Sequence, residues 1–595
     1  MTSRIRACVS SLCAFSLRLG VAIALLVGLS SGCNEPRKAP PERVILVTID
    51  TLRADRVGCY GDAQARTPTM DTLAAHGVRF ETAISPAPLT LPAHTSLMTA
   101  LDPPHHAVRH NSIHRLGDGL PTLAEALRGA GYSTAAFVGA VVLERRYGLA
   151  RGFDVYDDRL MDRQSSQTVG YAERSADHVV DAALHWLESA PPRFFVWLHF
   201  YDPHAAYTPP AGFAMAFASD PYRGEIAFAD FQLGRFLAAL RARFGEAGLL
   251  VAVASDHGES LGEHGEPRHS YSIYDATQRV PLILAGVGMP EGLVVKAPVR
   301  LVDVAPTLLE AAGLPPLPAA DGRALQPLIE SREDEPRTAY VETFATRYDY
   351  GWSALQGLRT DRFKYIRAPR PELYDVKQDP GERDDLAARL PEVARELDAQ
   401  LTKRLARTSP APTPQAVTLD PEERELLRSL GYVAPEGAPE SETGDPISGP
   451  DPKDAMGLLV RLAEAERYSL LERPKDALAA LRDLEDPPTA VAALRATFAL
   501  KAGEYAAAER DALRALAREP RRLDVRLVLA SALEAQGDLA SARAAWEEAT
   551  RLDPRSTAAW QGLARTAQKQ GDASLAARAR ETAERLSREE FRSAP

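Results

Sequence analysis

The sequence places metal-binding residue types directly after two apolar stretches. Val44–Ile49 runs into Asp50, and Leu249–Ala254 is followed one residue later by Asp256 and His257. Apolar runs of this length are typical of strands buried on both faces of a parallel sheet, and ligands gather at the carboxyl ends of such strands. Alone, Asp50 could equally cap a helix. Together the three residues predict a site for a divalent ion: Zn, Mn, Mg or Ca, with the imidazole favouring zinc or a transition metal.

Thr90 lies in a segment that predicts both a helix start and a reactive hydroxyl. Pro92 belongs in the first turn of a helix, which places Thr90 just ahead of the helix N-terminus. Such an end favours an anion such as phosphate or sulfate. A hydroxyl bound to a divalent metal is a candidate nucleophile, so we predict Thr90 as nucleophile and as a further metal ligand. The alternative is an ordinary N-cap. His94 and Asn111 are further candidates to bind the substrate.

More histidines follow the same strands. His204 comes after the apolar run Phe194–Phe200, and His269 follows Asp256-His257 by a dozen positions. We expect both to protonate a leaving group or to stabilise an oxyanion. For two others, His199 and His264, an active-site role and a structural role both remain open.

The elements around these residues alternate between strand and helix from residue 43 to 330. Strands are expected at 44–49, 134–138, 194–200, 249–254 and 281–285, and helices at 69–76, 122–128, 172–189 and 225–242. Such alternation predicts an α/β domain with a mostly parallel sheet and helices on both faces. From 335 to 405 the pattern predicts a small antiparallel subdomain with a turn at Thr360-Asp361, closed by a helix over Pro391–Leu405.

The C-terminal part of the sequence is repetitive. Residues 406–453 read as a linker rich in Pro, Gly, Ser and Glu, with a short helix at Pro421–Leu430. In 454–592, Gly503, Gly537 and Gly571 are spaced by 34 residues, the period of the tetratricopeptide repeat. A degenerate first repeat is expected at 454–487, where Pro474 begins the segment that replaces the glycine turn. Stacked repeats form a surface for a protein partner.

The N-terminus predicts export. Two arginines, an apolar run and small residues precede Cys33, which is the layout of a signal over residues 1–32 with a lipidated cysteine and a tether over 33–42. We expect a lipoprotein anchored to a membrane of the bacterial cell envelope; simple secretion is the alternative. The mature chain would keep only Cys33 and Cys59, which argues against a disulfide. The net charge of −11 speaks against a nucleic-acid partner.

Taken in order, these motifs resemble the sulfatase family of the alkaline phosphatase superfamily. The resemblance covers about residues 43–405, including the segments around Asp50, Thr90 and His204, Ser255-Asp-His-Gly-Glu259, and Glu372-Leu-Tyr-Asp-Val-Lys-Gln-Asp-Pro-Gly-Glu382. It implies the sulfatase-like fold, one divalent metal ion held by Asp50, Asp256 and His257, Thr90 as nucleophile, and His204 and His269 beside the transferred group. Lys364-Tyr365 would match scaffold positions.

Three features that the family uses for sulfate are absent from the sequence. Sulfatases carry Cys or Ser in a Cys/Ser-x-Pro-x-Arg motif and convert it to formylglycine, whereas this chain has Thr90-Leu-Pro-Ala-His94. Thr51 replaces the second of the paired acids, and Gly139-Ala-Val-Val142 replaces a Gly-Lys-x-His segment. The resemblance then favours a phosphate or phosphonate ester substrate. Related branches sometimes use a second metal ion, which Asp202, His204 and His269 would hold. The alternatives are a sulfuric ester hydrolase that works without formylglycine and a weakly catalytic scaffold whose repeats recruit a protein.

Overall fold

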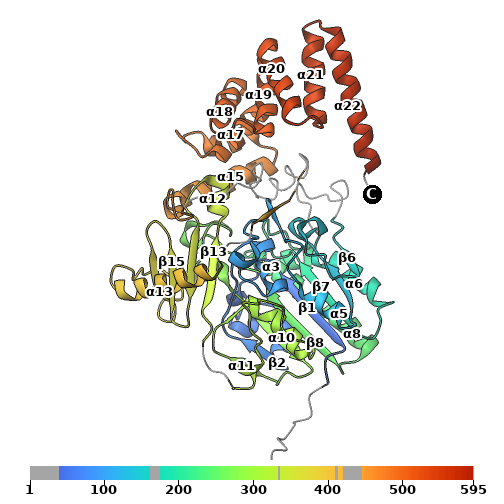
Figure 1. Cartoon of the computed structure of the whole chain (residues 1–595), viewed down its shortest axis with the longest axis vertical. Coiled ribbons are helices and arrows are strands. Elements are labelled where there is room, and N and C mark those ends of the chain that lie inside the picture. Colours follow the sequence, from blue (N-terminus) through green and yellow to red (C-terminus); the bar gives the residue numbers. More distant parts are fainter. Residues whose placement is uncertain are drawn as a thin grey trace, which may run out of the picture. The chain divides into compact units, whose positions relative to one another are not determined.

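An eight-stranded sheet forms the centre of the catalytic part (Figure 1). The computed structural model describes residues 39–160, 174–332, 336–408, 413–417, 419 and 445–593. The strand order is β11-β2-β10-β8-β1-β7-β5-β6, and β1 runs parallel to both β7 and β8. The strands are β1 Arg43–Ile49, β2 Gly77–Phe80, β5 Ser133–Phe137, β6 Val155–Asp157, β7 Phe194–Phe200, β8 Leu249–Ser255, β10 Leu282–Gly286 and β11 Leu293–Val295. The predicted α/β class with a mostly parallel sheet is confirmed, although β10 is antiparallel to its neighbours.

Helices cover both faces of this sheet because the central strands are apolar on both sides. In β1, Val44 and Leu46 pack into one core, whereas Ile45 and Val47 pack into the other. This alternation follows from the two-residue period of a strand. The helices of the catalytic part are α2 Pro68–Ala75, α3 Thr90–Thr99, α4 Pro103–His106, α5 Leu123–Gly129, α6 Ala176–Leu187, α7 Ala211–Ala216, α8 Pro221–Phe244, α9 Asp275–Gln278, α10 Val304–Ala311, α11 Gln326–Ile329 and α12 Ala345–Tyr350. Leucines of α3, α5 and α10 belong to the first core, and apolar residues of α2, α6 and α8 belong to the second.

The predicted antiparallel subdomain is present. Its four strands are β13 Ala339–Thr343, β14 Leu355–Arg359, β15 Phe363–Arg367 and β16 Glu372–Asp375, and α13 Pro391–Leu405 lies along β15 (Figure 1). Thr360 begins the turn between β14 and β15, where its N–H donates to the Phe363 carbonyl. Five short strands complete the fold as β3 Ala83–Ile84, β4 His114–Arg115, β9 Arg279–Val280, β12 Val299–Arg300 and β17 Gln415–Ala416.

Buried ions attach the subdomain to the catalytic sheet. Lys364 of β15 is fully buried, and its ammonium lies 2.9 Å from Asp275 and 3.2 Å from Glu382. Arg359 of β14 pairs with the same Asp275 at 3.1 Å. Two cations hold the pKa of Asp275 below its ordinary value despite burial, which otherwise raises it. A buried ion pair that loses one partner costs about 3–5 kcal/mol, so this network fixes how the subdomain docks.

The repeat region consists of paired helices, as the 34-residue period predicts. They are α15 Met456–Leu470, α16 Pro474–Leu481, α17 Thr489–Ala502, α18 Tyr505–Arg518, α19 Leu523–Gln536, α20 Leu539–Leu552, α21 Thr557–Lys569 and α22 Ala573–Ser593. Gly503 and Gly537 end α17 and α19 with φ of +78° and +85°, a conformation that glycine adopts without strain. In the degenerate first pair, α15 and α16, Glu472 takes the positive φ instead. Residues 41–595 cluster as one compact unit.

Several predictions lie outside the described residues: the export signal, Cys33, most of the tether, and the short helix at 421–430. Among the helices that the structure describes, none combines the length and apolar character needed to cross a membrane.

Candidate active site and metal centre

Strand pairing brings the predicted metal ligands to one edge of the sheet. Ile49, the last residue of β1, is level with Ser255 at the end of β8, so the next residues, Asp50 and Asp256, lie side by side. Asp50, Asp256 and His257 are fully buried, and one ligand atom from each lies within 4.8 Å of the others. Burial raises the pKa of Asp50 to about 6. The pKa of Asp256 is also raised above its ordinary value, by burial and by the neighbouring Asp50.

Thr90 contributes its hydroxyl to the same cluster. Its Oγ1 lies 3.4 Å from Oδ2 of Asp50 and 3.5 Å from Nε2 of His257. Contrary to the sequence prediction, Thr90 is the first residue of α3 and Leu89 is the cap residue, with no side-chain capping bond. The hydroxyl therefore does not serve as an N-cap. It is directed at the cluster, because the first residue of the helix sits directly above the ends of β1 and β8.

The cluster has the dimensions of a tetrahedral metal site. Nε2 of His257 is 3.6 Å from Oδ1 of Asp50 and 3.5 Å from Oδ2 of Asp256. In a tetrahedral site with metal–ligand bonds of about 2.1 Å, two ligand atoms lie about 3.4 Å apart, which matches these spacings. Asp50 Oδ1 and Asp256 Oδ2 are buried without a hydrogen-bond partner, and buried carboxylate oxygens are normally paired. The residues therefore fit one divalent ion.

The rings of His269 and His204 continue from His257, the imidazole of the cluster. Nδ1 of His257 and of His204 lie 3.0 Å and 2.8 Å from the carbonyls of Gly258 and Ala205. Because a carbonyl can only accept, both Nδ1 atoms carry the proton and both Nε2 atoms keep a lone pair. The ring of His269 lies between them, 4.6 Å from His257 and 5.1 Å from His204. Burial also lowers the pKa of His204 well below its ordinary value, so its ring is neutral.

His269 is held by residues that the sequence analysis did not single out. Its Nδ1 is 3.1 Å from Oε1 of Glu259, and the other carboxylate oxygen accepts a hydrogen bond from Tyr207 at 3.0 Å. This pattern of carboxylate and histidine fixes the ring orientation. Glu259 follows Asp256 by only three residues, so its proximity could have been foreseen, whereas Tyr207 gives no signal in the sequence.

The two candidates for substrate contact have different surroundings. Oδ1 of Asn111 accepts the N–H of Leu91 at 2.9 Å, and its Nδ2 is buried without a partner. That amide is a spare donor beside the first turn of α3. His94 instead has both ring nitrogens engaged, by the Thr90 carbonyl and by Thr48. Its prediction as a substrate contact is therefore not supported, because neither ring nitrogen is free for a substrate.

The structure also places Asp202, an expected ligand of a second metal ion, and His264, whose role the sequence left open. Asp202 accepts the N–H of Ala176 at the start of α6 at 2.8 Å. It forms no three-ligand cluster with His204 and His269 among the described residues; the second cluster found there is His94, His199 and Asp256. His264 stacks on Tyr274 with ring centroids 3.6 Å apart, so its role is structural.

His199 and the segment that replaces Gly-Lys-x-His lie together. Nδ1 of His199 accepts the N–H of Gly139 at 3.4 Å, so Nε2 carries the proton and points toward Oδ2 of Asp50 at 3.5 Å. Burial lowers the pKa of His199 to about 4. His199 therefore supports a metal ligand as a neutral donor, and residues 139–142 supply no cation there.

A small cavity of about 60 Å³ opens beside His204 and His269. One wall consists of Tyr271, Tyr350 and Asp349 from the catalytic part, and another comes from α15 with Leu459, Leu462 and Glu466. Arg268 and Glu466 are joined by an ion pair of 3.5 Å. The first repeat helix is thus part of the site.

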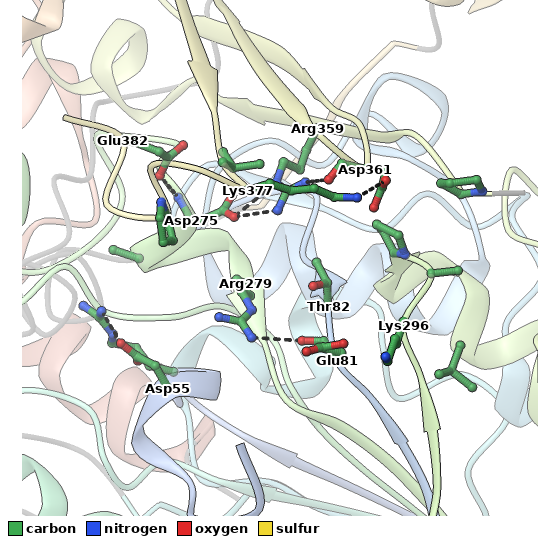
Figure 2. A pocket seen from close by; sticks show the side chains of 18 of the residues that line it. Asp55, Glu81, Thr82, Asp275, Arg279, Lys296, Arg359, Asp361, Lys377 and Glu382 are labelled. Carbon is green, nitrogen blue, oxygen red and sulfur yellow. Dashed lines mark hydrogen bonds and ion pairs between the residues drawn. The ribbon is translucent and has the colours of Figure 1, made fainter. Parts of the chain in front are cut away.

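A much larger cleft is elsewhere. It has a volume of about 770 Å³ and lies between the sheet edge and the subdomain (Figure 2). Its charged side chains are largely paired with one another: Arg359 with Asp275, Lys377 with Asp361, and Arg279 with the Glu81 carbonyl (Figure 2). Its size alone therefore does not make it the reactive site, which lies at the buried cluster of acids and histidines.

Comparison with known proteins places this geometry in a family. Residues 42–314 match the sulfatase family model, 262–410 the C-terminal model of N-sulphoglucosamine sulphohydrolase, and 523–566 a tetratricopeptide repeat. The chain is 26% identical to the Delta 4,5-hexuronate-2-O-sulfatase of Bacteroides thetaiotaomicron over 58% of this chain and 84% of that protein. It is 34% identical to chicken (Gallus gallus) arylsulfatase K over 30% of this chain, but spans only 35% of that protein.

The fold is shared with solved structures of both ester classes. The phosphonate monoester hydrolase of Agrobacterium radiobacter superposes with a TM-score of 0.54 at 23% identity, covering 62% of this chain and 96% of that one. A 2-O GAG sulfatase superposes with a TM-score of 0.51 at 22% identity, covering 65% and 96%. Residues 42–314 are therefore similar to the sulfatase family, and residues 523–566 to a tetratricopeptide repeat.

Proposed function

We propose that this chain is a metal-dependent hydrolase or transferase that cleaves phosphate or phosphonate esters through Thr90. The observation that carries the proposal is the position of the Thr90 hydroxyl, 3.4 Å from Asp50 and 3.5 Å from His257. A threonine cannot be converted to formylglycine because its Cβ bears a methyl group. Its alkoxide can attack phosphorus directly.

The metal that Asp50, Asp256 and His257 would hold lowers the pKa of a bound hydroxyl and offsets negative charge on the ester. The residues of the chain do the rest. Thr90 Oγ1 forms a bond to phosphorus as the ester oxygen leaves, which gives a phosphothreonine. The departing alkoxide takes a proton from Nε2 of His269, whose Nδ1 is held by Glu259. Water or an acceptor alcohol then attacks phosphorus, its proton passes to the same histidine, and the bond to Thr90 breaks.

Asn111 has a defined part in this scheme. Its Nδ2 carries two hydrogens that no protein group accepts, in a buried place beside the first turn of α3. A donor held in this way is preorganised for a phosphoryl oxygen on which charge develops. The N-terminus of α3 adds its own N–H groups.

A sulfuric ester hydrolase that works without formylglycine is the second candidate. The named relatives favour it, because the Bacteroides enzyme and arylsulfatase K are both sulfatases by name. The chemistry favours phosphorus, since threonine lacks the route by which a formylglycine hydrate releases sulfate.

The test uses the full chain without residues 1–33, loaded with Mn or Zn. Matched nitrophenyl esters of phosphate (mono and di), phosphonate and sulfate are compared, with Thr90→Ala alongside. Turnover of a phosphorus ester that is lost in the variant, while metal is retained, supports the proposal. Turnover of the sulfate ester alone supports the second candidate. An inert protein that binds no metal supports a scaffold role.

We also propose that the chain is exported and lipidated at Cys33, and that the repeats bind a protein partner. The arrangement of residues 1–33 supports the first part, and the helix pairs of 456–593 support the second. Labelled palmitate incorporated into wild-type protein but not into Cys33→Ala would support the anchor. Unlabelled, freely soluble protein from both would support simple secretion.

A further inference from the structure

We propose that His94 is a positioning residue, which holds the Thr90 nucleophile in register with the metal ligands through its backbone. The inference rests on Thr90 as nucleophile, the proposed function above. It starts from a buried hydrogen-bonded chain that connects Trp197, Thr48, His94 and the carbonyl of Thr90. These residues belong to β7, β1 and α3.

The direction of each hydrogen bond in the chain can be assigned. The Thr90 carbonyl only accepts, so Nδ1 of His94 donates to it at 2.8 Å. Trp197 Nε1 only donates, so Thr48 Oγ1 accepts from it at 2.9 Å and donates its own hydrogen onward. Nε2 of His94 accepts that hydrogen at 2.9 Å. Burial keeps the ring neutral and lowers the pKa of His94 to about 3, which agrees with this assignment.

This series of hydrogen bonds connects the segments that carry Thr90 and Asp50, the two groups whose spacing matters most for the chemistry. Thr48 is the second-last residue of β1 and Asp50 directly follows the strand, so the two residues are two positions apart on the same backbone segment. His94 lies one helical turn after Thr90 on α3. The bond between His94 and Thr48 therefore ties the nucleophile's helix to the strand that presents Asp50. This tie helps to set the 3.4 Å separation of Thr90 Oγ1 and Asp50 Oδ2.

The surroundings exclude looser roles for His94. Both ring nitrogens are engaged, by the Thr90 carbonyl and by Thr48, so the ring has no free donor or acceptor for a substrate. His94, His199 and Asp256 could in principle hold a second ion. However, Nδ1 of His94 carries a proton and Nε2 already accepts one, which leaves no lone pair for a metal.

Three variants test the proposal in the full metal-loaded chain. His94→Asn places an amide where Nδ1 was, so it keeps a donor for the Thr90 carbonyl and loses the tie to Thr48. His94→Leu has similar bulk and loses both bonds. His106→Asn is the matched control, because His106 is also buried and bonds Ser96 of the same helix at 2.8 Å. Because a misplacement of about 1 Å can cost about 100-fold in rate, we expect kcat to fall about 100-fold in His94→Leu and about 10-fold in His94→Asn.

The expected KM is unchanged in both His94 variants, and kcat and KM are unchanged in His106→Asn. Equal kcat in His94→Leu and wild type, or a loss confined to KM, would overturn the proposal. Two readouts do not depend on turnover. Nitrogen NMR of the histidine rings, assigned by the signal missing from His94→Asn, should show the proton on Nδ1. Metal analysis should give one bound ion per chain in wild type and His94→Leu alike.

These two readouts separate the inference from the proposed function. A wild-type protein that turns over no ester would refute the function, yet the ring proton and the metal count would still decide whether His94 serves Thr90 or binds an ion. A proton on Nε2, or two ions in wild type and one in His94→Leu, would refute the positioning role even in an active enzyme.

Discussion

Glu259 holds His269 by a hydrogen bond of 3.1 Å from Nδ1 to Oε1, and the carboxylate itself is fully buried. Its second oxygen is occupied by Tyr207. The imidazole therefore has one fixed orientation, with Nε2 on the side of His257 and His204, whose rings both lie within about 5 Å of it.

The first prediction concerns this pair. Glu259→Gln keeps a carbonyl oxygen for His269 but removes the charge, and outer partners of this kind contribute about 10- to 100-fold in activity. We expect kcat to drop by about that factor with KM and metal content unchanged. Steady-state kinetics on a nitrophenyl ester measure it. Glu263→Gln, in the same loop but half exposed, is the control, and equal rates for both variants would rule the pairing out as functional.

The second prediction concerns metal removal. Asp50 Oδ1 and Asp256 Oδ2 lack protein partners, so a bound cation would stabilise the folded state. At a metal concentration 100 times Kd, stabilisation is about 2.7 kcal/mol. Thermal unfolding of chelator-treated protein should therefore shift upward by several degrees on adding Mn or Zn. Asp256→Asn should lose most of the shift. A melting temperature insensitive to metal in the wild type would contradict the site.

The third prediction concerns Glu266, which is buried and bonded to Ser272 and to the N–H of Tyr271. Burial raises its pKa to about 8. Below pH 4.5 the folded and unfolded states both hold the proton; between 4.5 and 8 only the folded state does. The contribution of Glu266 to the free energy of unfolding is therefore greatest below pH 4.5. It falls by on the order of a few kcal/mol as pH rises from 4.5 through 8 and is absent above that.

Glu266→Gln keeps both hydrogen bonds and does not ionise. We expect its melting temperature to match wild type near pH 5, to exceed it by a growing margin up to pH 8, and to keep a constant margin above pH 8. Thermal melts across this range are the measurement. A constant difference between the two proteins at all pH values would mean that Glu266 is not protonated in the folded state.

The fourth prediction concerns the wall that the repeats contribute to the cavity. Leu462 of α15 faces it, together with Leu459 and Glu466. A tryptophan at 462 would fill the space of about 60 Å³. We expect kcat/KM for an ester with a bulky leaving group to fall more than about tenfold, with little change for a methyl ester. Val460→Trp, on the exposed side of the same helix, should behave as wild type. Equal effects on both esters would place the leaving group elsewhere.

The sequence was sufficient for the features that depend on one strand and its end. The meeting of Asp50 with Asp256 and His257 follows from parallel pairing of two apolar strands. The repeat pairs follow from a fixed period. The helix was predicted to begin just after Thr90, whereas Thr90 is its first residue. Because proline is tolerated throughout the first turn, Pro92 does not define the exact helix start.

The remaining features depend on side chains from several elements. The role of His94 is defined by Thr48 and Trp197, which lie on two different strands, and its position in a motif suggested substrate contact instead. The contribution of Leu462 to the site depends on how a helix far along the chain packs near His269. No local pattern encodes such contacts.

The origin of that wall also sets an order of events during biosynthesis. Every candidate metal ligand and His269 lie before residue 270, whereas Leu459, Leu462 and Glu466 are translated almost 200 residues later. A nascent chain can thus assemble its reactive centre while one side of it is still open to solvent. The cavity beside His269 is complete only after α15 has folded against it. A truncated product that ends in the linker would therefore keep the candidate ligands but lack this wall.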